Sequence, residues 1–157
     1  MANLGLCANF FSNHLWYWGD QHYEITVGPE RAHQLEPCAS AVRAGVPFSV
    51  HSDAGVTPLG SLHTMWCAVN RMTPSGRTLG EQEKISPLQG LKAVTVDAAY
   101  QLHLDHEIGS LEAGKKADIA ILAEDPLSVD PMHIKDIDVL GTFLAGELFP
   151  AACSSLQ

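Results

Sequence analysis

Two short apolar segments dominate the first third of the chain, at Leu4 to Phe11 and at Val46 to His51. Each is almost unbroken instead of alternating, which is typical of a strand buried on both faces of a parallel sheet. Between them, residues 29–44 have a helical pattern that Pro37 is expected to divide in two, and Gly45 suits the position after a helix end. The pattern therefore predicts a β-loop-α-β unit, in which a right-handed crossover joins two parallel strands.

Two further helical patterns follow the second strand. Residues 59–72 place apolar side chains at helical spacing, and Thr57 and Pro58 suit the N-cap and the first position of that helix. Ser86 precedes a second helical pattern, which is expected to run over residues 87–102. Helices that alternate with buried strands indicate an α/β fold.

The character of the chain changes after Gly109. Short strands are predicted at residues 118–122, 134–145 and 147–149, and Gly146 suits a tight hairpin between the last two. We expect these strands to form a small β-unit in a second layer. The predicted organisation is an α/β part at residues 1–108, a β part at residues 109–150 and a tail at residues 151–157.

Composition limits the kinds of partner and the cellular compartment. The chain has 157 residues, of which 46% are hydrophobic, so a sizeable core is expected. The formal net charge of −9 argues against a nucleic-acid partner, which normally requires a basic face. No apolar run approaches the ~20 residues of a membrane span, and the N-terminus lacks the basic region of a signal peptide. The four cysteines form no C-x-x-C pair and are scattered, so we expect reduced thiols in a cytoplasmic protein. From the charge and the lack of a membrane span we expect no nucleic-acid partner and no membrane association.

The segment His51-Ser52-Asp53-Ala54 follows the second apolar strand and carries the main chemical signal. Alternation along an extended strand would place Ser49, His51 and Asp53 on one side. In a parallel barrel the carboxyl ends of the strands carry the site, and a carboxylate there can bind a divalent metal and accept a proton from metal-bound water. Asp53 is therefore a candidate metal ligand and catalytic residue, with His51 beside it. The alternative is that Asp53 caps the next helix or closes a turn.

The end of the first strand offers a second group of candidates. Alternation would bring His14 to the same side as Phe10 and Ser12, at the mouth of the same site. There His14 could bind metal, polarise a substrate carbonyl or donate a hydrogen bond. The aromatic residues that follow are expected to form a loop, in which Trp16 and Trp18 provide an apolar substrate wall. In the alternative, the tryptophans cover the rim of the barrel and His14 packs against them.

Several common catalytic motifs are missing from the sequence. It contains no G-x-S-x-G nucleophile elbow, no Walker A loop and no G-x-G-x-x-G fingerprint. A serine hydrolase, a nucleotidase and a dehydrogenase therefore lose support, and metal-dependent hydrolysis is the chemistry that Asp53 indicates.

Three stretches of the chain resemble the amidohydrolase superfamily, and within it the family-3 type that includes YtcJ-like and N-substituted formamide deformylase-like proteins. Residues 9–20, with the sequence NFFSNHLWYWGD, resemble the segment after the seventh barrel strand. Residues 51–54 resemble the end of the eighth strand, and residues 109–122 resemble the return into the small β-sandwich that flanks the barrel. Together the resemblance covers the chain up to about Phe149.

The resemblance implies an α/β fold made of the last two strands and helices of a (β/α)8 TIM-type barrel, with part of a flanking small β-sandwich. It implies hydrolysis of an amide-type C–N bond in a small molecule. The attacking water would be activated by one or two divalent metal ions, usually zinc. On this chain Asp53 matches the eighth-strand aspartate, a metal ligand and proton shuttle. His14 matches a position near the substrate, and we take Trp18 and His51 as further substrate-binding residues.

The other metal ligands of the family, beginning with a first-strand His-x-His, have no counterpart in this sequence. We therefore expect a truncated, C-terminal chain that is inactive alone. One alternative is a complementing subunit, for which a second chain carries the first six strands or a homo-oligomer forms. Another is a small binding module that uses its aromatic segment without catalysis.

Overall fold

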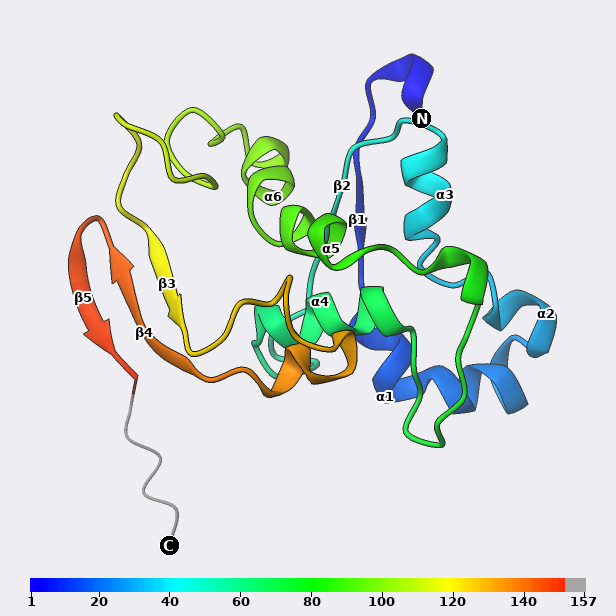
Figure 1. Ribbon diagram of the computed structural model, residues 1–157. Helices are drawn as coiled ribbons and strands as arrows, with labels where there is room; N and C mark the ends of the chain where they lie inside the picture. Colours follow the sequence, from blue (N-terminus) through cyan, green and yellow to red (C-terminus); the bar gives the residue numbers. More distant parts are fainter. Residues whose placement is uncertain (152–157) are drawn as a thin grey trace, which may run out of the picture.

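The computed structural model describes residues 1–151, and its central layer is the predicted pair of parallel strands. Strand β1 (Ala8–Phe10) pairs with β2 (Phe48–Val50), so that Ala8 lies opposite Phe48 and Phe10 opposite Val50. The two strands lie side by side in the middle of Figure 1. β1 is shorter than expected, because residues 2–4 form a 3-10 turn that ends at Gly5 with a φ of 62°.

The connection between β1 and β2 is helical from its start. It comprises α1 (Asn13–Gln21), a π-helical turn (His22–Thr26), α2 (Pro29–Ala32) and α3 (Cys38–Arg43). The prediction of two helical pieces around Pro37 is confirmed, but the expected aromatic loop is wrong. Leu15 and Gly19 share the buried face of α1, where a Cβ on Gly19 would come within 2.6 Å of the Thr73 side chain. A glycine on a packed face obscures the helical spacing of apolar residues in the sequence.

Three further helices pack near the strand pair, namely α4 (Ser61–Asn70), α5 (Pro87–Ala93) and α6 (Val96–Gln101). α5 begins with a capping box, in which the side chains of Ser86 and Gln89 bind each other's backbone N–H groups. The single helix expected over residues 87–102 is wrong, because the chain breaks at Thr95 with φ −128° and ψ −94°. The Thr95 hydroxyl donates to the carbonyl of Leu91, which competes with the helical backbone bonds.

The main core lies between the strand pair and α4. Residues 65–68 of α4 are all buried and pack with Phe48 and Val50 of β2. The indole N–H of Trp66 donates to the carbonyl of Met132 at 2.8 Å. This bond fixes a 3-10 helix (Pro131–Asp136) against α4 and so connects the C-terminal third of the chain to the core.

Three of the four cysteines lie within the described residues, and all three are free thiols. Cys38 and Cys67 are buried, and desolvation raises the pKa of the Cys38 thiol to about 12 and raises that of Cys67 as well. Cys7 is half-buried and also unpaired, whereas Cys153 lies outside the described residues.

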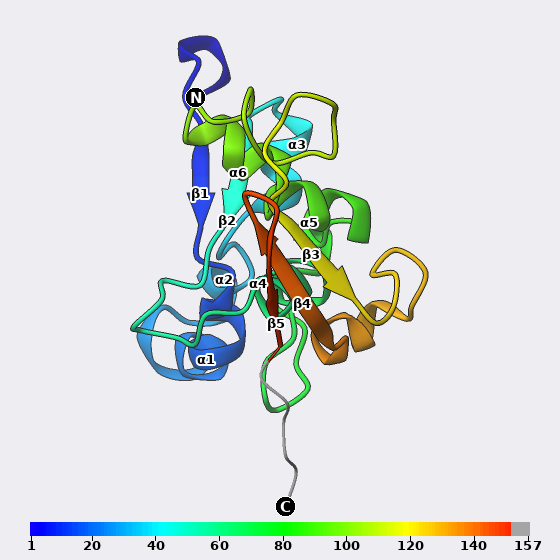
Figure 2. The same cartoon turned by 90° about the vertical axis from the view of Figure 1, so that its left-hand side faces the viewer.

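The second layer is an antiparallel sheet with the strand order β3 (Ile119–Leu122), β4 (Val139–Leu144) and β5 (Glu147–Pro150). It stands apart from β1 and β2 in Figure 1 and Figure 2. The predicted hairpin is confirmed, because Ala145 and Gly146 form a two-residue turn with φ of 51° and 87°. The strand expected from Ile134 begins only at Val139, since residues 131–136 are a 3-10 helix. Within the part of the chain that the structure describes, every helix is too short or too polar to span a bilayer.

Candidate active site at the strand ends

Buried hydrogen bonds hold the start of α1 against the segment that follows β2. The side-chain amide of Asn13 donates to the hydroxyl of Thr57 at 2.8 Å, and the hydroxyl of Ser12 donates to the carbonyl of Thr64 at 2.8 Å. The prediction that Thr57 caps the next helix is wrong, because its hydroxyl donates to the Ser52 carbonyl and α4 begins later. The carboxyl ends of both strands therefore open onto one shared face.

His14 lies in the first turn of α1, among aromatic rings. Its ring centroid is 4.3 Å from that of Phe11, 5.4 Å from that of Trp18 and 5.3 Å from that of His22. Desolvation by burial lowers the pKa of His14, and the carboxylate of Asp53 opposes this shift. His14 thus lies at the strand ends, although the predicted strand alternation is wrong because the chain is already helical there.

His51 and Asp53 follow β2 directly. The His51 ring is stacked on Phe11, with centroids 5.2 Å apart and an angle of 17° between the planes. Asp53 has a positive φ of 51°, and its backbone N–H donates to Nδ1 of His51 at 3.1 Å. The predicted alternation that groups Asp53 with His51 is wrong, because the strand ends at Val50. Asp53 instead closes a turn, in which its carbonyl accepts from the backbone N–H of Val56 at 2.8 Å.

The two tryptophans of α1 belong to different parts of the molecule. The Trp18 ring lies 6.0 Å from that of Phe11 and contacts His14, so it borders the strand ends. The Trp16 ring meets Trp66 of α4 edge-on at 5.3 Å, and it packs against the main core. The prediction that Trp16 and Trp18 together form an apolar substrate wall is therefore wrong for Trp16.

The sequence interpretation missed Glu36, which the crossover brings to the same place. Its Oε1 lies 3.5 Å from Nδ1 of His14, and its side chain is 13% exposed. Desolvation by burial raises the pKa of Glu36, whereas the charges of Arg71 and His51 oppose the shift. The position of Glu36 before Pro37 is the one feature of the local sequence that marks this residue. Its contact with His14 cannot be read from the local sequence, because it joins α1 to a turn further along the chain.

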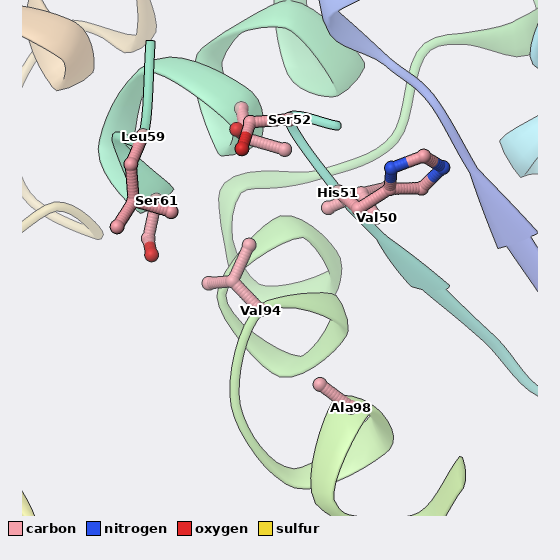
Figure 3. A pocket seen from close by; sticks show the side chains of 8 residues that line it. Val50, His51, Ser52, Leu59, Ser61, Val94 and Ala98 are labelled. Carbon is pink, nitrogen blue, oxygen red and sulfur yellow. The ribbon is translucent and has the colours of Figure 1, made fainter. Parts of the chain in front are cut away.

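A pocket of about 210 Å³ opens beside the end of β2. It is lined by the strand end, the start of α4 and the region where α5 gives way to α6. Figure 3 shows the imidazole of His51 directed away from Leu59, Ser61 and Val94, which line this pocket. His51 is itself one of the residues that line the pocket, and its ring stacks on Phe11.

The residues of this face do not by themselves fit a bound zinc ion. Within residues 1–151, no group of three or more histidine, cysteine or carboxylate side chains is arranged to hold a metal. Two buried side-chain atoms there, Asn13 Oδ1 and His22 Nε2, have no hydrogen-bond partner among the described residues. Buried polar atoms are normally paired, so these two atoms are exceptions to the general pattern.

Parallel strands that alternate with helices, and a small antiparallel sheet beside them, are consistent with part of an α/β barrel. The chain is similar to an uncharacterized metal-dependent hydrolase from Pyrococcus horikoshii OT3, with a TM-score of 0.68 and 21% identity. The likeness covers 83% of this chain and 27% of that one. It confirms the expected fold class, part of a TIM-type barrel with a small sheet.

Residues 1–149 match the model of the Amidohydrolase family, and the chain belongs to that family. It is 30% identical over 149 residues to N-substituted formamide deformylase of Arthrobacter pascens, and 22% identical over 125 residues to the putative amidohydrolase YtcJ of Bacillus subtilis strain 168. The alignments cover 94% and 78% of this chain but 27% and 24% of the relatives, so the chain spans about a quarter of their length. The resemblance to the family-3 type is confirmed.

Proposed function

We propose that this chain forms part of the active site of a metal-dependent amidohydrolase that cleaves an amide-type C–N bond in a small molecule. The observation that carries the proposal is that His14, His51 and Asp53 follow two paired parallel strands in a member of the Amidohydrolase family. In barrels of this kind the carboxyl ends of the strands bear the catalytic groups. The deformylase relative makes N-substituted formamides the first substrates to test.

Asp53 is the proposed metal ligand and proton acceptor. Its turn leaves the residue exposed just beyond the end of β2, and its charge reaches His14. Among the described residues no side chain pairs with its carboxylate, so both oxygens remain free to hold a cation or take up a proton. A divalent metal, which we propose to be zinc, would supply an acidified water when bound.

His14, Trp18 and His51 are the proposed substrate-binding residues. Phe11 lies against both histidines, and Trp18 meets His14 edge-on, so the group combines apolar rings with polar ring nitrogens. Small-molecule sites commonly combine apolar walls with a few polar groups that fix orientation. The lowered pKa of His14 favours a neutral ring, which suits contact with an uncharged amide.

The remaining metal ligands are proposed to come from outside this sequence, on a complementary part of the barrel or on another copy of the chain. Within the described residues β1 and β2 pair only with each other, so each strand has an unpaired edge. Unpaired strand edges favour the addition of further strands. On this proposal the chain alone holds no tightly bound zinc and hydrolyses no amide.

The first test is the metal content and activity of the pure chain. We expect well below one zinc ion per chain by elemental analysis after loose metal is removed, and no metal-dependent release of formate from an N-substituted formamide. We then expect both tight zinc binding and formate release in a chimera. In this chimera the chain replaces the matching segment of the Arthrobacter pascens deformylase.

The role of Asp53 is tested in the same chimera. Replacement Asp53→Asn should lower kcat by about 10²-fold or more, because a carboxylate that binds metal and accepts a proton is lost. The matched control is Asp105→Asn, which removes an exposed aspartate in the loop after α6. Tight binding of one zinc by the pure chain, with turnover, would contradict the need for outside ligands. Full activity of the Asp53→Asn chimera would contradict the role of Asp53.

A further inference from the structure

We infer that Glu36 is a positioning residue for His14, whose imidazole it holds with the proton on Nδ1 and the lone pair on Nε2. With this tautomer His14 accepts a hydrogen bond from a substrate N–H, such as the N–H of a secondary amide, and does not polarise the carbonyl. The statement about the substrate rests on the proposed function, whereas the statement about the imidazole ring does not.

The contact between these two side chains is partly buried, and Glu36 is the more buried of the two. Glu36 Oε1 lies 3.5 Å from His14 Nδ1, and the two side chains are 13% and 37% exposed. A nitrogen lone pair that faces a carboxylate oxygen at this distance is repelled, whereas an N–H is attracted, and partial burial enlarges the difference. The backbone N–H of Phe11 and the charges of Arg71 and His51 favour the charged form of the Glu36 carboxylate, against the desolvation that raises its pKa.

Aromatic neighbours restrict the rotation of the His14 ring. Phe11 lies at 4.3 Å with an angle of 42° between the rings, while Trp18 and His22 meet His14 nearly edge-on, at 86° and 78°. Packing on these sides opposes the 180° turn of the ring that would put Cδ2 in place of Nδ1 opposite Glu36. The nitrogen that faces Glu36 is therefore set by packing, and the carboxylate then sets the tautomer.

The turn that carries Glu36 is held in an unusual backbone conformation. Glu36 has a φ of 46°, in the left-handed region that non-glycine residues rarely adopt. Arg71 is fully buried, and its Nη1 donates to the carbonyl of Glu36 at 2.8 Å, while Nη2 donates to the carbonyl of Leu35. Strain of this kind persists where the surroundings determine it, and it concentrates at functional sites. The strained turn is what brings the Glu36 carboxylate to His14.

The test is a measurement of the His14 tautomer by two-bond ¹H–¹⁵N correlation on the uniformly ¹⁵N-labelled chain. The pH is chosen high enough for the His14 ring to be neutral. The signals of His14 are those that disappear in His14→Gln. We expect the Nδ1–H tautomer to dominate in the unmodified chain, by about tenfold over Nε2–H. A dominant Nε2–H tautomer would overturn the positioning.

Glu36→Gly is the informative variant, because glycine adopts a positive φ without strain and the fold is therefore retained. We expect the tautomer ratio of His14 to fall at least fivefold in Glu36→Gly and to recover in part in Glu36→Gln, which restores a carbonyl acceptor. Glu30→Gln removes an exposed carboxylate of α2 and should leave the ratio unchanged. An unchanged ratio in Glu36→Gly would show that the carboxylate does not hold the ring.

The substrate statement is tested in the deformylase chimera with two formamides, one bearing an N–H and one fully substituted on nitrogen. We expect Glu36→Gly to reduce the kcat/KM preference for the N–H substrate by about tenfold, mainly through KM, because one hydrogen bond is lost. An unchanged preference would overturn the substrate statement. A failure of the chimera to hydrolyse any amide would count against the proposed function alone, since the tautomer is measured without metal or substrate.

Discussion

The side chains of Asn13 and Thr57 are joined across 44 positions of sequence, with Nδ2 of the amide 2.8 Å from Oγ1 of the hydroxyl. Thr57 in turn donates to the carbonyl of Ser52. Asn13 immediately precedes His14, and Thr57 ends the turn that begins after His51. This bonded chain adds to the backbone bond from the His51 N–H to the Phe10 carbonyl, and both hold the end of β1 next to the end of β2.

Replacement Thr57→Val should lower the free energy of unfolding by about 1–3 kcal/mol. The change removes the hydroxyl and leaves the amide of fully buried Asn13 and the Ser52 carbonyl without a partner. Urea unfolding followed by circular dichroism measures the difference. Thr57→Ser keeps the hydroxyl and should cost less, so equal losses in the two variants would contradict the assigned role of the hydroxyl.

The second prediction concerns acid stability and Asp20. Desolvation is the largest single influence and acts to raise the pKa of Asp20, but hydrogen bonds from Ser75 and Thr73 and the charge of Arg77 outweigh it. The pKa of Asp20 therefore lies below its ordinary value of 3.8. A lowered folded-state pKa stabilises the fold above the unfolded-state pKa, and this stability is lost as the pH falls through the folded-state pKa.

We therefore expect Asp20→Asn to unfold more easily than the unmodified chain at pH 7 and to approach it in stability as the pH falls below about 3.8. Urea midpoints measured from pH 7 down to pH 2.5 give this convergence directly. Asp105→Asn is the control, because that residue is exposed in the loop after α6. Parallel pH profiles for Asp20→Asn and the unmodified chain would count against the Asp20 network.

The third prediction concerns the buried guanidinium of Arg71. It donates to the carbonyls of Leu35, Glu36 and Leu79. Arg71→Met should destabilise the fold by about 3 kcal/mol or more, because each unpaired buried carbonyl costs about 1–3 kcal/mol. Arg71→Lys keeps the charge but lacks the planar fork, so its loss should be intermediate. Arg43→Met removes a more exposed arginine, and a loss as large as that of Arg71→Met would contradict the prediction.

The fourth prediction compares two glycines with similar φ angles. Gly76 has a φ of 83° and open space around a Cβ, whereas Gly80 has a φ of 70° and would place a Cβ 2.1 Å from the carbonyl oxygen of His33. Gly76→Ala should cost about 1 kcal/mol through backbone strain alone. Gly80→Ala should cost about 1–3 kcal/mol more, since backbone must move. Thermal unfolding of both variants tests the difference, and equal melting temperatures would refute the predicted clash.

Local patterns were sufficient to predict the parallel pair, the division of the crossover at Pro37 and the hairpin at Gly146. Each depends on signals within a few residues, such as unbroken apolar segments or a turn glycine. The break at Thr95 was not predicted, because its hydroxyl competes with the backbone only in that particular geometry. Likewise α1 was mistaken for a loop, since Gly19 packs against Thr73, a contact that no local pattern contains.

The candidate site was predictable only in part. His14 and Asp53 were identified because they follow apolar strands, although both leave the strand geometry that the prediction assumed. Glu36 was not identified, because its contact with His14 depends on how the crossover folds back. Burial, which raises the pKa of Glu36 and lowers that of His14, is a tertiary property that neighbouring residues in sequence do not reveal.

Helix α4 ties the two layers of the molecule together along its length. Near its start the carbonyl of Thr64 accepts from the hydroxyl of Ser12, and further along Trp66 and Asn70 donate to carbonyls of the 3-10 helix that precedes β4. These bonds link the 3-10 helix before the small sheet, through α4, to Ser12, which lies two positions before His14. The small sheet and the strand ends are therefore connected through α4, so a force on the sheet has a path of hydrogen bonds to the residues where the chemistry is proposed to occur.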